Sequence, residues 1–425
     1  TLVRSTPVAD TFGVEMRQIA ADRGLGLAAE AGIRWVRRNG LLWAAVEAAP
    51  GERNWDAVAG LESELRAAHE RDLQVILVVR HAPAWAQAVP GHACGPVAPE
   101  ALDDLAQFMF DVVQRYSAPP FGVRHWELWN EPDVDPDLVA ADSPFGCWGD
   151  MEDPYYGAGT YAQMLQAVYP AIKAADPGAQ VLLGGLLLDR EPAPEDTDVP
   201  GRFLEGVLHA GGGDYFDIVS FHAYAQFWGE VVDWEMQAPA WAARGGIVAG
   251  KVSFLREVLA DYGYEKPLML TESGLLCRTC ETGADEVFLS AQAAYVPRLY
   301  VRNDALGLMA TIWYTLEGPG WRNAGLLEAD AQPRPSFRAF QILSSSLPDE
   351  CAMTDADSAA DVARYVYHCP DGQIWVLWSR DGSDLQFPAP KGFQEAYDLY
   401  GEPIAADGRS ITVGFEPIYL QISAP

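Results

Sequence analysis

The sequence predicts an α/β protein, built as a (β/α)8 TIM barrel with a small antiparallel β domain at its carboxyl end. Short β-rich runs alternate with amphipathic helical stretches over the first 345 residues, which is typical of a parallel sheet. Beyond residue 345 only short alternating β runs remain. A length of 425 residues accommodates both parts, because such barrels often exceed about 250 residues as one domain. The 49% hydrophobic and 21% charged residues indicate an ordinary globular core.

Eight runs rich in apolar and β-branched residues are expected to form the barrel strands. Between them, residues 56–72 and 101–116 carry apolar side chains on one helical face. Two long segments, residues 133–160 and 223–249, follow predicted strands and are therefore expected at the catalytic face of the barrel. The expected strands lie at about residues 11–16, 33–38, 75–80, 123–129, 181–187, 216–222, 267–271 and 308–313.

The expected division places the barrel at residues 1–345 and a β-sandwich-like accessory domain at residues 346–425. A last helix near residues 336–345 would close the barrel. The β runs of the second part lie at residues 363–368, 373–379, 394–399, 410–413 and 418–422.

The charge balance restricts the partners of the chain. The formal net charge is −31, from 60 acidic and 29 basic residues, so phosphate backbones and anionic lipid surfaces would be repelled. No apolar run approaches the roughly 18 residues that a membrane span requires. We therefore expect no nucleic-acid partner and no membrane insertion, while the oligomeric state stays open.

The six cysteines form three suggestive pairs, although six cysteines allow 15 pairings. The pairs are Cys94 with Cys147, Cys277 with Cys280, and Cys351 with Cys369. We expect at least two of them to be oxidised, which would place the protein in a secreted or extracytoplasmic location. The alternative is a reduced cytoplasmic protein with several small buried cysteines.

Two glutamates end predicted strands on opposite sides of the barrel mouth. Glu131 follows strand four, and the proline after it is expected to hold Glu131 extended, on the same side of the strand as Glu127. Glu272 follows strand seven. Glycoside cleavage needs such a pair, one acid to protonate the leaving oxygen and one carboxylate at the anomeric carbon. Once Glu272 is ionised, like-charge repulsion is expected to raise the pKa of Glu131.

Several motifs along residues 10–345 carry a family resemblance. They are Trp-Asn-Glu-Pro at 129–132, Thr-Glu-Ser-Gly at 271–274, Trp-Val-Arg at 35–37, Pro-Ala-Trp-Ala at 83–86 and Ser-Phe-His-Ala-Tyr at 220–224. Together they resemble the retaining glycoside hydrolases of clan A, most closely family 39-like or family 5-like members. The Cys-Arg-Thr-Cys turn after strand seven, at residues 277–280, matches nothing in that pattern.

The resemblance implies roles for the individual residues. Glu131 would be the general acid/base and Glu272 the nucleophile. Asn130 would bind the sugar 2-hydroxyl, and Arg37 or Tyr224 would orient Glu272. The remaining expected substrate-binding residues are His81, His222, Trp313 as an aromatic platform, Trp148 and Trp228. Simple packing or ion pairing stays open for Arg37, His222, His81 and Trp313.

Other chemistries have little support in the sequence. Schiff-base barrels need a lysine at a strand end, and none of Lys173, Lys251, Lys266 and Lys391 lies at one. The seven histidines are scattered, and no phosphate-binding glycine motif follows a strand. We therefore expect neither a cofactor nor a catalytic metal.

The resulting prediction is a retaining hydrolase of β-glycosidic bonds in an oligo- or polysaccharide. The aromatic residues of the two long loops favour a groove, unless they only pin the loops to the barrel: Trp148, Tyr155, Tyr156, Trp228, Trp234 and Trp241. An exo-acting β-glycosidase of β-xylosidase or β-glucosidase type, or an inactive carbohydrate-binding barrel, are the alternatives. The acidic surface favours neutral or basic glycans over polyuronates.

Overall fold

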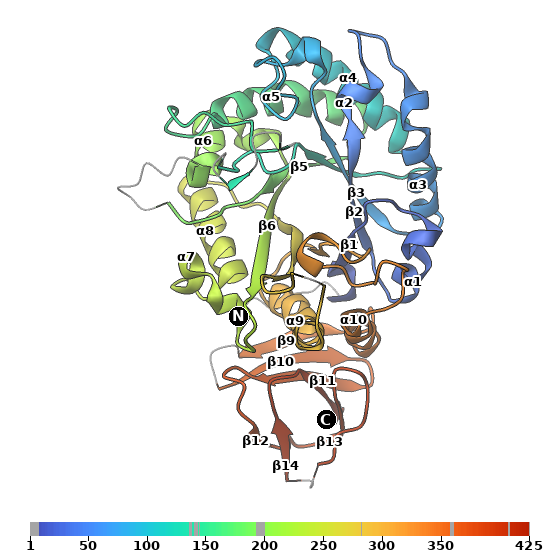
Figure 1. Ribbon diagram of the computed structural model, residues 1–425, viewed down its shortest axis with the longest axis vertical. Helices are drawn as coiled ribbons and strands as arrows, with labels where there is room; N and C mark the ends of the chain where they lie inside the picture. Colours follow the sequence, from blue (N-terminus) through green and yellow to red (C-terminus); the bar gives the residue numbers. More distant parts are fainter. Residues whose placement is uncertain are drawn as a thin grey trace.

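A computed structural model shows a closed barrel of eight parallel strands (Figure 1). It describes residues 8–135, 138–139, 143, 145–192, 200–281, 283–357, 361–406 and 409–424. Each barrel strand pairs with the next one in sequence, and the last strand pairs with the first. The strands are β1 (Phe12–Glu15), β2 (Trp35–Leu42), β3 (Gln74–Arg80), β4 (His125–Leu128), β5 (Gln180–Leu186), β6 (Ile218–Phe227), β7 (Leu268–Cys277) and β8 (Thr311–Trp313). The predicted barrel is thus confirmed.

The helices surround this barrel. The two helices predicted from their apolar faces are present as α3 and α4, and α3 starts three residues later than expected because a 3-10 turn at Trp55–Val58 precedes it. The helices are α1 (Leu25–Glu30), α2 (Trp43–Val46), α3 (Ala59–His69), α4 (Leu102–Tyr116), α5 (Ala158–Ala175), α6 (Phe203–His209), α7 (Pro239–Ala242), α8 (Ile247–Asp261), α9 (Glu286–Ala305) and α10 (Pro335–Ser346). None of the helices in the described part of the chain has the length and apolar character needed to cross a membrane.

The barrel interior has an apolar layer near the amino ends of the strands and a charged layer above it. Trp35 on β2 belongs to the apolar layer, which also contains Ile76, Leu182, Ile218, Met269 and Ile312. Successive side chains of a strand point to opposite faces, so Arg37 faces the same interior two residues further on. Arg37 is fully buried. The apolar layer therefore closes the barrel below the charged groups.

The carboxyl-terminal part forms two antiparallel sheets (Figure 1). The larger one has the order β13-β15-β11-β10-β9, and β12 pairs with β14. Two of these strands were not predicted: β9 is rich in polar residues and β12 has only four residues, so neither has a clear apolar alternation. The strands are β9 (Ala352–Asp357), β10 (Val362–Cys369), β11 (Gly372–Ser379), β12 (Leu385–Pro388), β13 (Phe393–Tyr397), β14 (Ser410–Val413) and β15 (Ile418–Ser423).

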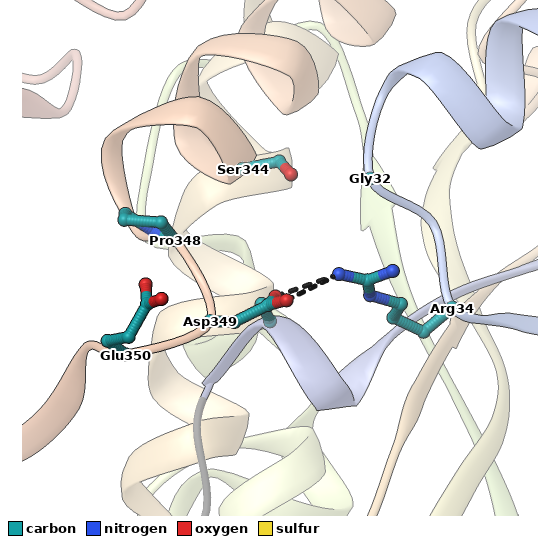
Figure 2. A pocket seen from close by; sticks show the side chains of 7 residues that line it. Gly32, Arg34, Ser344, Pro348, Asp349 and Glu350 are labelled. Atoms are coloured by element: carbon teal, nitrogen blue, oxygen red, sulfur yellow. Dashed lines mark hydrogen bonds and ion pairs between the residues drawn. The ribbon is translucent and has the colours of Figure 1, made fainter.

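The change from α10 to β9 is consistent with a division near residue 345, which stays a prediction. Arg34, just before β2, donates to both carboxylate oxygens of Asp349 at 2.8 Å. This pair lines a cavity of about 250 Å³ between the start of β2 and the end of α10 (Figure 2). The cavity lies at the amino ends of the barrel strands, away from the catalytic face.

The sheets pack against α9 and the segment that follows β6. The guanidinium of Arg298 on α9 lies 3.8 Å from the ring centroid of Phe415 and 5.5 Å from that of Trp378. Arg302, one turn further, forms two hydrogen bonds of 2.8 and 2.6 Å with Asp233. These contacts tie the segment after β6 to both parts of the chain.

The same segment corrects part of the groove prediction. Trp234 is only 1% exposed and packs edge-on against Phe415, and Trp241 is equally buried against Phe254. These two rings therefore pack the segment against the rest of the protein, as in the alternative that the aromatic residues only hold the loops in place. They are not available for stacking on a sugar.

All three cysteine pairs are disulfides, with Cα–Cα distances of 5.6 Å for Cys94–Cys147, 5.6 Å for Cys277–Cys280 and 4.3 Å for Cys351–Cys369. The predicted pairing is confirmed. The first bridge joins the segment after β3 to the segment after β4, and the second closes the turn at the end of β7. Two of the three thus stabilise the catalytic face.

Candidate active site

Arg37 is the centre of the charged layer and donates hydrogen bonds to four residues at once. Nη1 donates to Glu15 Oε2 at 2.6 Å and also to Glu272 Oε1. Nη2 donates to Glu127 Oε1 at 2.5 Å and to Asn130 Oδ1 at 2.6 Å. Since these partners come from β1, β7, β4 and the residues after β4, one side chain links opposite walls of the barrel.

Burial sets the protonation of Glu15 within this layer. Removal from water raises the pKa of Glu15 to about 8, and the Arg37 guanidinium opposes that effect only in part. Glu15 therefore keeps its proton to a higher pH than an exposed glutamate does, which reduces the negative charge that Arg37 must balance. Glu15 could not be selected from the sequence, because the segment around it matches no motif.

The backbone around Glu131 differs from the prediction. Strand β4 ends at Leu128, and both Trp129 and Glu131 adopt left-handed conformations, with φ of 65° and 48°. The expectation of an extended Glu131 on the Glu127 side of a continuing strand is therefore wrong. Such conformations cost about 1–3 kcal/mol each and persist where the surroundings hold them. Here Trp129 Nε1 donates to the Cys94 carbonyl at 2.9 Å, beside the first disulfide.

Glu131 and Glu272 nevertheless meet at the barrel mouth, with His222 between them. His222 Nδ1 lies 2.7 Å from Glu131 Oε1 and 3.6 Å from Glu272 Oε2. One oxygen of each carboxyl and the imidazole nitrogen lie within 4.8 Å of one another. Burial lowers the pKa of His222 to about 4, so the imidazole is neutral at pH 7.

Both oxygens of Glu272 have a donor. Arg37 donates to Oε1, and the Tyr224 hydroxyl donates to Oε2. The sequence left Arg37 and Tyr224 as alternatives for this contact, and the structure brings both to Glu272. The carboxylate is thus held from two sides, which restricts its rotation.

A buried lysine and aspartate support the segment behind Glu131. Lys251 Nζ donates to the carbonyls of Leu187 at 2.6 Å and His222 at 2.8 Å. Asp133 accepts from the backbone N–H groups of Leu187 and Leu188, both at 2.8 Å. The two side chains therefore form hydrogen bonds to the same stretch of backbone after β5 and connect it to the residues around Glu131 and His222.

The pKa of Glu131 is raised to about 7. Burial is the cause, while the positive charges of Arg37 and Lys251 act in the opposite direction. The direction agrees with the prediction, but the expected cause, repulsion from an ionised Glu272, is replaced by burial.

His81 does not contact Glu131 or Glu272 directly in the bonds described, and it connects to the site through Arg80 and Asn39. Its Nε2 contacts Arg80 Nη1, and Arg80 Nε donates to Asn39 Oδ1 at 2.6 Å. Asn39 in turn lies 3.5 Å from Asn130 Oδ1. The structure thus connects His81 to the site through other side chains at the rim.

The structure does not support Trp313 and Trp148 as substrate-binding residues, because both are buried. Trp313 is fully buried, its Nε1 donates to the Ala324 carbonyl at 2.8 Å, and its ring lies 6.0 Å from that of Tyr295. Trp148 is buried between Trp129 and Tyr161, with ring distances of 5.3 and 5.1 Å. Neither ring can stack on a ligand in this structure. Tyr156 is buried as well, with its hydroxyl on the Val134 carbonyl.

Other aromatic residues take their place at the mouth. Trp228 is 61% exposed, as expected for a stacking residue, and Trp321 is 51% exposed. Tyr314 and Trp321 pack edge-on against Tyr224, at ring distances of 5.9 and 5.7 Å. Neither Tyr314 nor Trp321 was predicted from the sequence. Both residues follow the eighth predicted strand, where side chains reach the barrel mouth. Because adjacent strand residues face opposite sides, a buried Trp313 indicates that Tyr314 faces the mouth instead.

The Glu131, His222 and Glu272 side chains are also the one group in the described residues with the spacing of a metal site. Two observations disfavour that use. Arg37 places a positive charge directly on Glu272, and the Tyr224 hydroxyl occupies its other oxygen. The group fits hydrogen-bonded acid chemistry better than cation binding.

No family model matches the chain, and no curated protein matches it significantly. Solved structures do resemble it. A family 39 glycoside hydrolase from Bacteroides cellulosilyticus has a TM-score of 0.73 at 19% identity, with 99% of this chain and 83% of that chain covered. A family 30 subfamily 8 xylanase from Clostridium acetobutylicum has a TM-score of 0.65 at 13% identity, with 98% and 96% covered.

A monomeric β-xylosidase from Caulobacter crescentus has a TM-score of 0.64 at 17% identity, with 99% of this chain and 98% of that chain covered. At these identities the likeness shows the fold, the barrel together with the β domain. The structural neighbours include family 39 enzymes, which the sequence motifs resemble, and family 30 enzymes, which the motifs did not indicate.

The raised pKa of Glu15 predicts a pH-dependent stability. Between pH 4.5 and about 8 the folded protein holds the Glu15 proton more tightly than the unfolded chain does, so stability falls as the pH rises through this window. Glu15→Gln keeps an acceptor for Arg37 without a titrating group. We expect urea midpoints at pH 5 and pH 8.5 to differ less in this variant than in the wild type. Glu70→Gln, on the barrel surface, is the control, and an unchanged difference in Glu15→Gln would contradict the assignment.

Proposed function

We propose that the protein is a retaining glycoside hydrolase acting on β-linked oligo- or polysaccharides, with Glu131 as acid/base and Glu272 as nucleophile. The separation of the two carboxyls carries this proposal. Their nearest oxygens lie within 4.8 Å. Retaining enzymes hold the pair about 5–5.5 Å apart, whereas inverting enzymes need about 6.5–9.5 Å to admit a water molecule.

The first step would join the sugar to the protein. Glu272 Oε attacks the anomeric carbon while Glu131 donates its proton to the leaving oxygen. The contacts from Arg37 and Tyr224 hold the attacking carboxylate in place. In the second step Glu131 takes a proton from water, which attacks the same carbon and releases the sugar. Side chains and water suffice for both steps.

The surroundings of Glu131 suit an acid that must also act as a base. A pKa of about 7 leaves a substantial protonated fraction at neutral pH and still allows return of the proton. The neutral His222 touches the carboxyl without adding a competing positive charge. Asn130 Oδ1 accepts from Arg37, and this leaves the amide N–H groups of Asn130 for the expected contact with a sugar hydroxyl.

The mode of cleavage follows from the exposed rings. Trp148, Trp234 and Trp241 are buried, so Trp228 and Trp321 are the exposed indoles that could line a substrate groove. One exposed indole follows β6 and the other follows β8, and this aromatic surface favours a substrate with more than one bound sugar. An exo-acting enzyme of the β-xylosidase type is the second candidate, and the likeness to the Caulobacter crescentus β-xylosidase favours it. The three disulfides support an extracytoplasmic location.

Substitution of the two carboxyls separates their roles. Glu272→Gln is expected to abolish turnover of every substrate, because no covalent intermediate forms. Glu131→Ala should lose roughly 10²- to 10⁴-fold on substrates with poor leaving groups and much less on nitrophenyl glycosides. Added azide should restore turnover of Glu131→Ala and yield a glycosyl azide of retained configuration. A retained azide product from Glu272→Ala would reverse the two assignments.

Lys251 is expected to shift the pH profile of the reaction. Its positive charge lowers the pKa of Glu131, so Lys251→Met should raise that pKa and move the alkaline limb of kcat/KM to higher pH. Lys251→Arg keeps the charge and is the matched comparison, with an alkaline limb close to that of the wild type. Equal loss of rate in both variants, without any movement of the limb, would leave Lys251 a purely structural role.

A further inference from the structure

Strand β5 carries a bulge near its end, made by Gly184 and Gly185. The pairing of β5 with β6 shifts by one residue just beyond Leu183. A Cβ atom at Gly184 would overlap the Leu128 carbonyl oxygen. Gly185 has a φ of 37°, and a Cβ atom there would overlap the His222 ring. The bulge therefore brings the bare backbone of β5 against the end of β4 on one side and against His222 on the other.

A tyrosine hydroxyl joins this bulge to the end of β4. Tyr161 lies in the first turn of α5 and is fully buried. Its hydroxyl donates to the Leu128 carbonyl at 2.5 Å and accepts from the Gly184 N–H at 2.8 Å. Buried backbone groups that lose such partners are costly. One side chain from a helix outside the barrel thus bridges two neighbouring strands.

The surroundings of Tyr161 fix the direction of its hydroxyl. The ring packs edge-on against Trp148 at 5.1 Å and against Phe203 at 5.4 Å. Burial raises the pKa of Tyr161, so the hydroxyl keeps its proton at neutral pH. A tyrosine hydroxyl has one proton to donate, and here it goes to the Leu128 carbonyl. The bridge therefore has a single arrangement.

Leu128 is the last strand residue before the proposed acid/base. The next residue, Trp129, donates from its backbone N–H to the Val79 carbonyl of β3 at 2.9 Å. Trp129 and Glu131 are then left-handed, and such conformations persist where the surroundings hold them. The end of β4 is thus held by β3 on one side and by Tyr161 on the other, and the turn that carries Glu131 starts from this point.

The bulge also supports the hydrogen-bond partner of the Glu131 carboxyl. His222 Nδ1 lies 2.7 Å from Glu131 Oε1, and the imidazole lies against the bare backbone of Gly185. The Gly185 N–H donates to the Ser220 hydroxyl at 2.9 Å. A shift of the bulge would therefore move the surface on which His222 rests. Both the backbone of Glu131 and the partner of its carboxyl depend on this part of β5.

We propose that Tyr161 is a positioning residue for Glu131, whose hydroxyl bridges β4 and β5 and thereby sets the place from which Glu131 delivers its proton to the leaving oxygen. A general acid must lie within hydrogen-bond reach of that oxygen, and a misplacement of about 1 Å can cost roughly 10²-fold in rate. Tyr161 acts through the backbone and not on the substrate. This inference rests on the proposed function, in which Glu131 is the acid.

The test compares the wild type with Tyr161→Phe, which keeps the ring and removes only the hydroxyl. The substrates are aryl β-glycosides of xylose, glucose and their β-linked disaccharides, with leaving groups from dinitrophenol to phenol. Phenol needs the proton from the acid, whereas dinitrophenol leaves with little help. In Tyr161→Phe we expect kcat/KM to fall roughly 10- to 100-fold for the phenyl glycosides and less than about threefold for the dinitrophenyl glycosides.

Tyr300→Phe is the matched control. Tyr300 is also fully buried, and its hydroxyl donates to the Gly13 carbonyl at 2.7 Å. Gly13 lies on β1, a strand that carries neither of the two proposed catalytic carboxyls. This variant should lose thermal stability, as Tyr161→Phe does, but should keep the wild-type ratio of kcat/KM between the two classes of leaving group. A purely structural effect would therefore not change the ratio.

The outcomes separate this inference from the function on which it rests. An equal fall for every leaving group in Tyr161→Phe, or no fall at all, would overturn the inference and leave the hydrolase intact. If the wild type hydrolyses none of the glycosides, the proposed function fails, and crystal structures of the wild type and Tyr161→Phe then decide the inference. Loss of the 2.7 Å contact between Glu131 and His222 in the variant would support it, and an unchanged contact would contradict it.

Discussion

The site depends on one buried cation, Arg37, at the centre of the charged layer. It contacts Glu15, Glu127, Asn130 and Glu272, which come from three strands and the segment after β4. Buried charges are tolerated only when they are paired and hydrogen-bonded, so loss of this cation would leave the carboxyls of Glu127 and Glu272 without compensation. Arg37 thus serves the fold and the reaction together, because the groups that neutralise it include the proposed nucleophile.

The reacting groups are held by supports that lie outside the barrel wall itself. The Lys251 and Asp133 side chains grip the peptide after β5, and the first disulfide lies beside the left-handed Trp129. On the other side, Trp313 and Arg334 fix the loop after β8. The carboxyl-terminal sheets brace α9 and the segment after β6 through Arg298 and Trp234. This arrangement explains how a site made largely of loop residues keeps a defined geometry.

The sequence predicts the barrel, the meeting of its two carboxyls and the disulfide pairs well. Barrel closure brings the residues after β4 and those on β7 to one opening, so Glu131 and Glu272 could be selected before any coordinates, although β7 continues past Glu272 to Cys277 where the sequence predicted its end at residue 271. The local conformation of Glu131 could not, because the strand ends three residues earlier and tertiary contacts hold its backbone left-handed. The exposure of the loop tryptophans could not be predicted either, as the buried Trp148, Trp234, Trp241 and Trp313 show. A sequence reveals that a ring lies in a loop, but the direction in which the loop folds decides whether the ring is packed or exposed.

The central claim is that Glu272 forms a covalent bond with the substrate sugar. The most direct measurement is mass spectrometry of the protein after reaction with an activated 2-deoxy-2-fluoro glycoside of a sugar that it hydrolyses, since the fluorine slows breakdown of the intermediate. The account predicts one added sugar per chain, on the peptide that contains Glu272, and no addition in Glu272→Gln. Labelling of Glu131, or rapid turnover to an inverted product without any labelled protein, would contradict it.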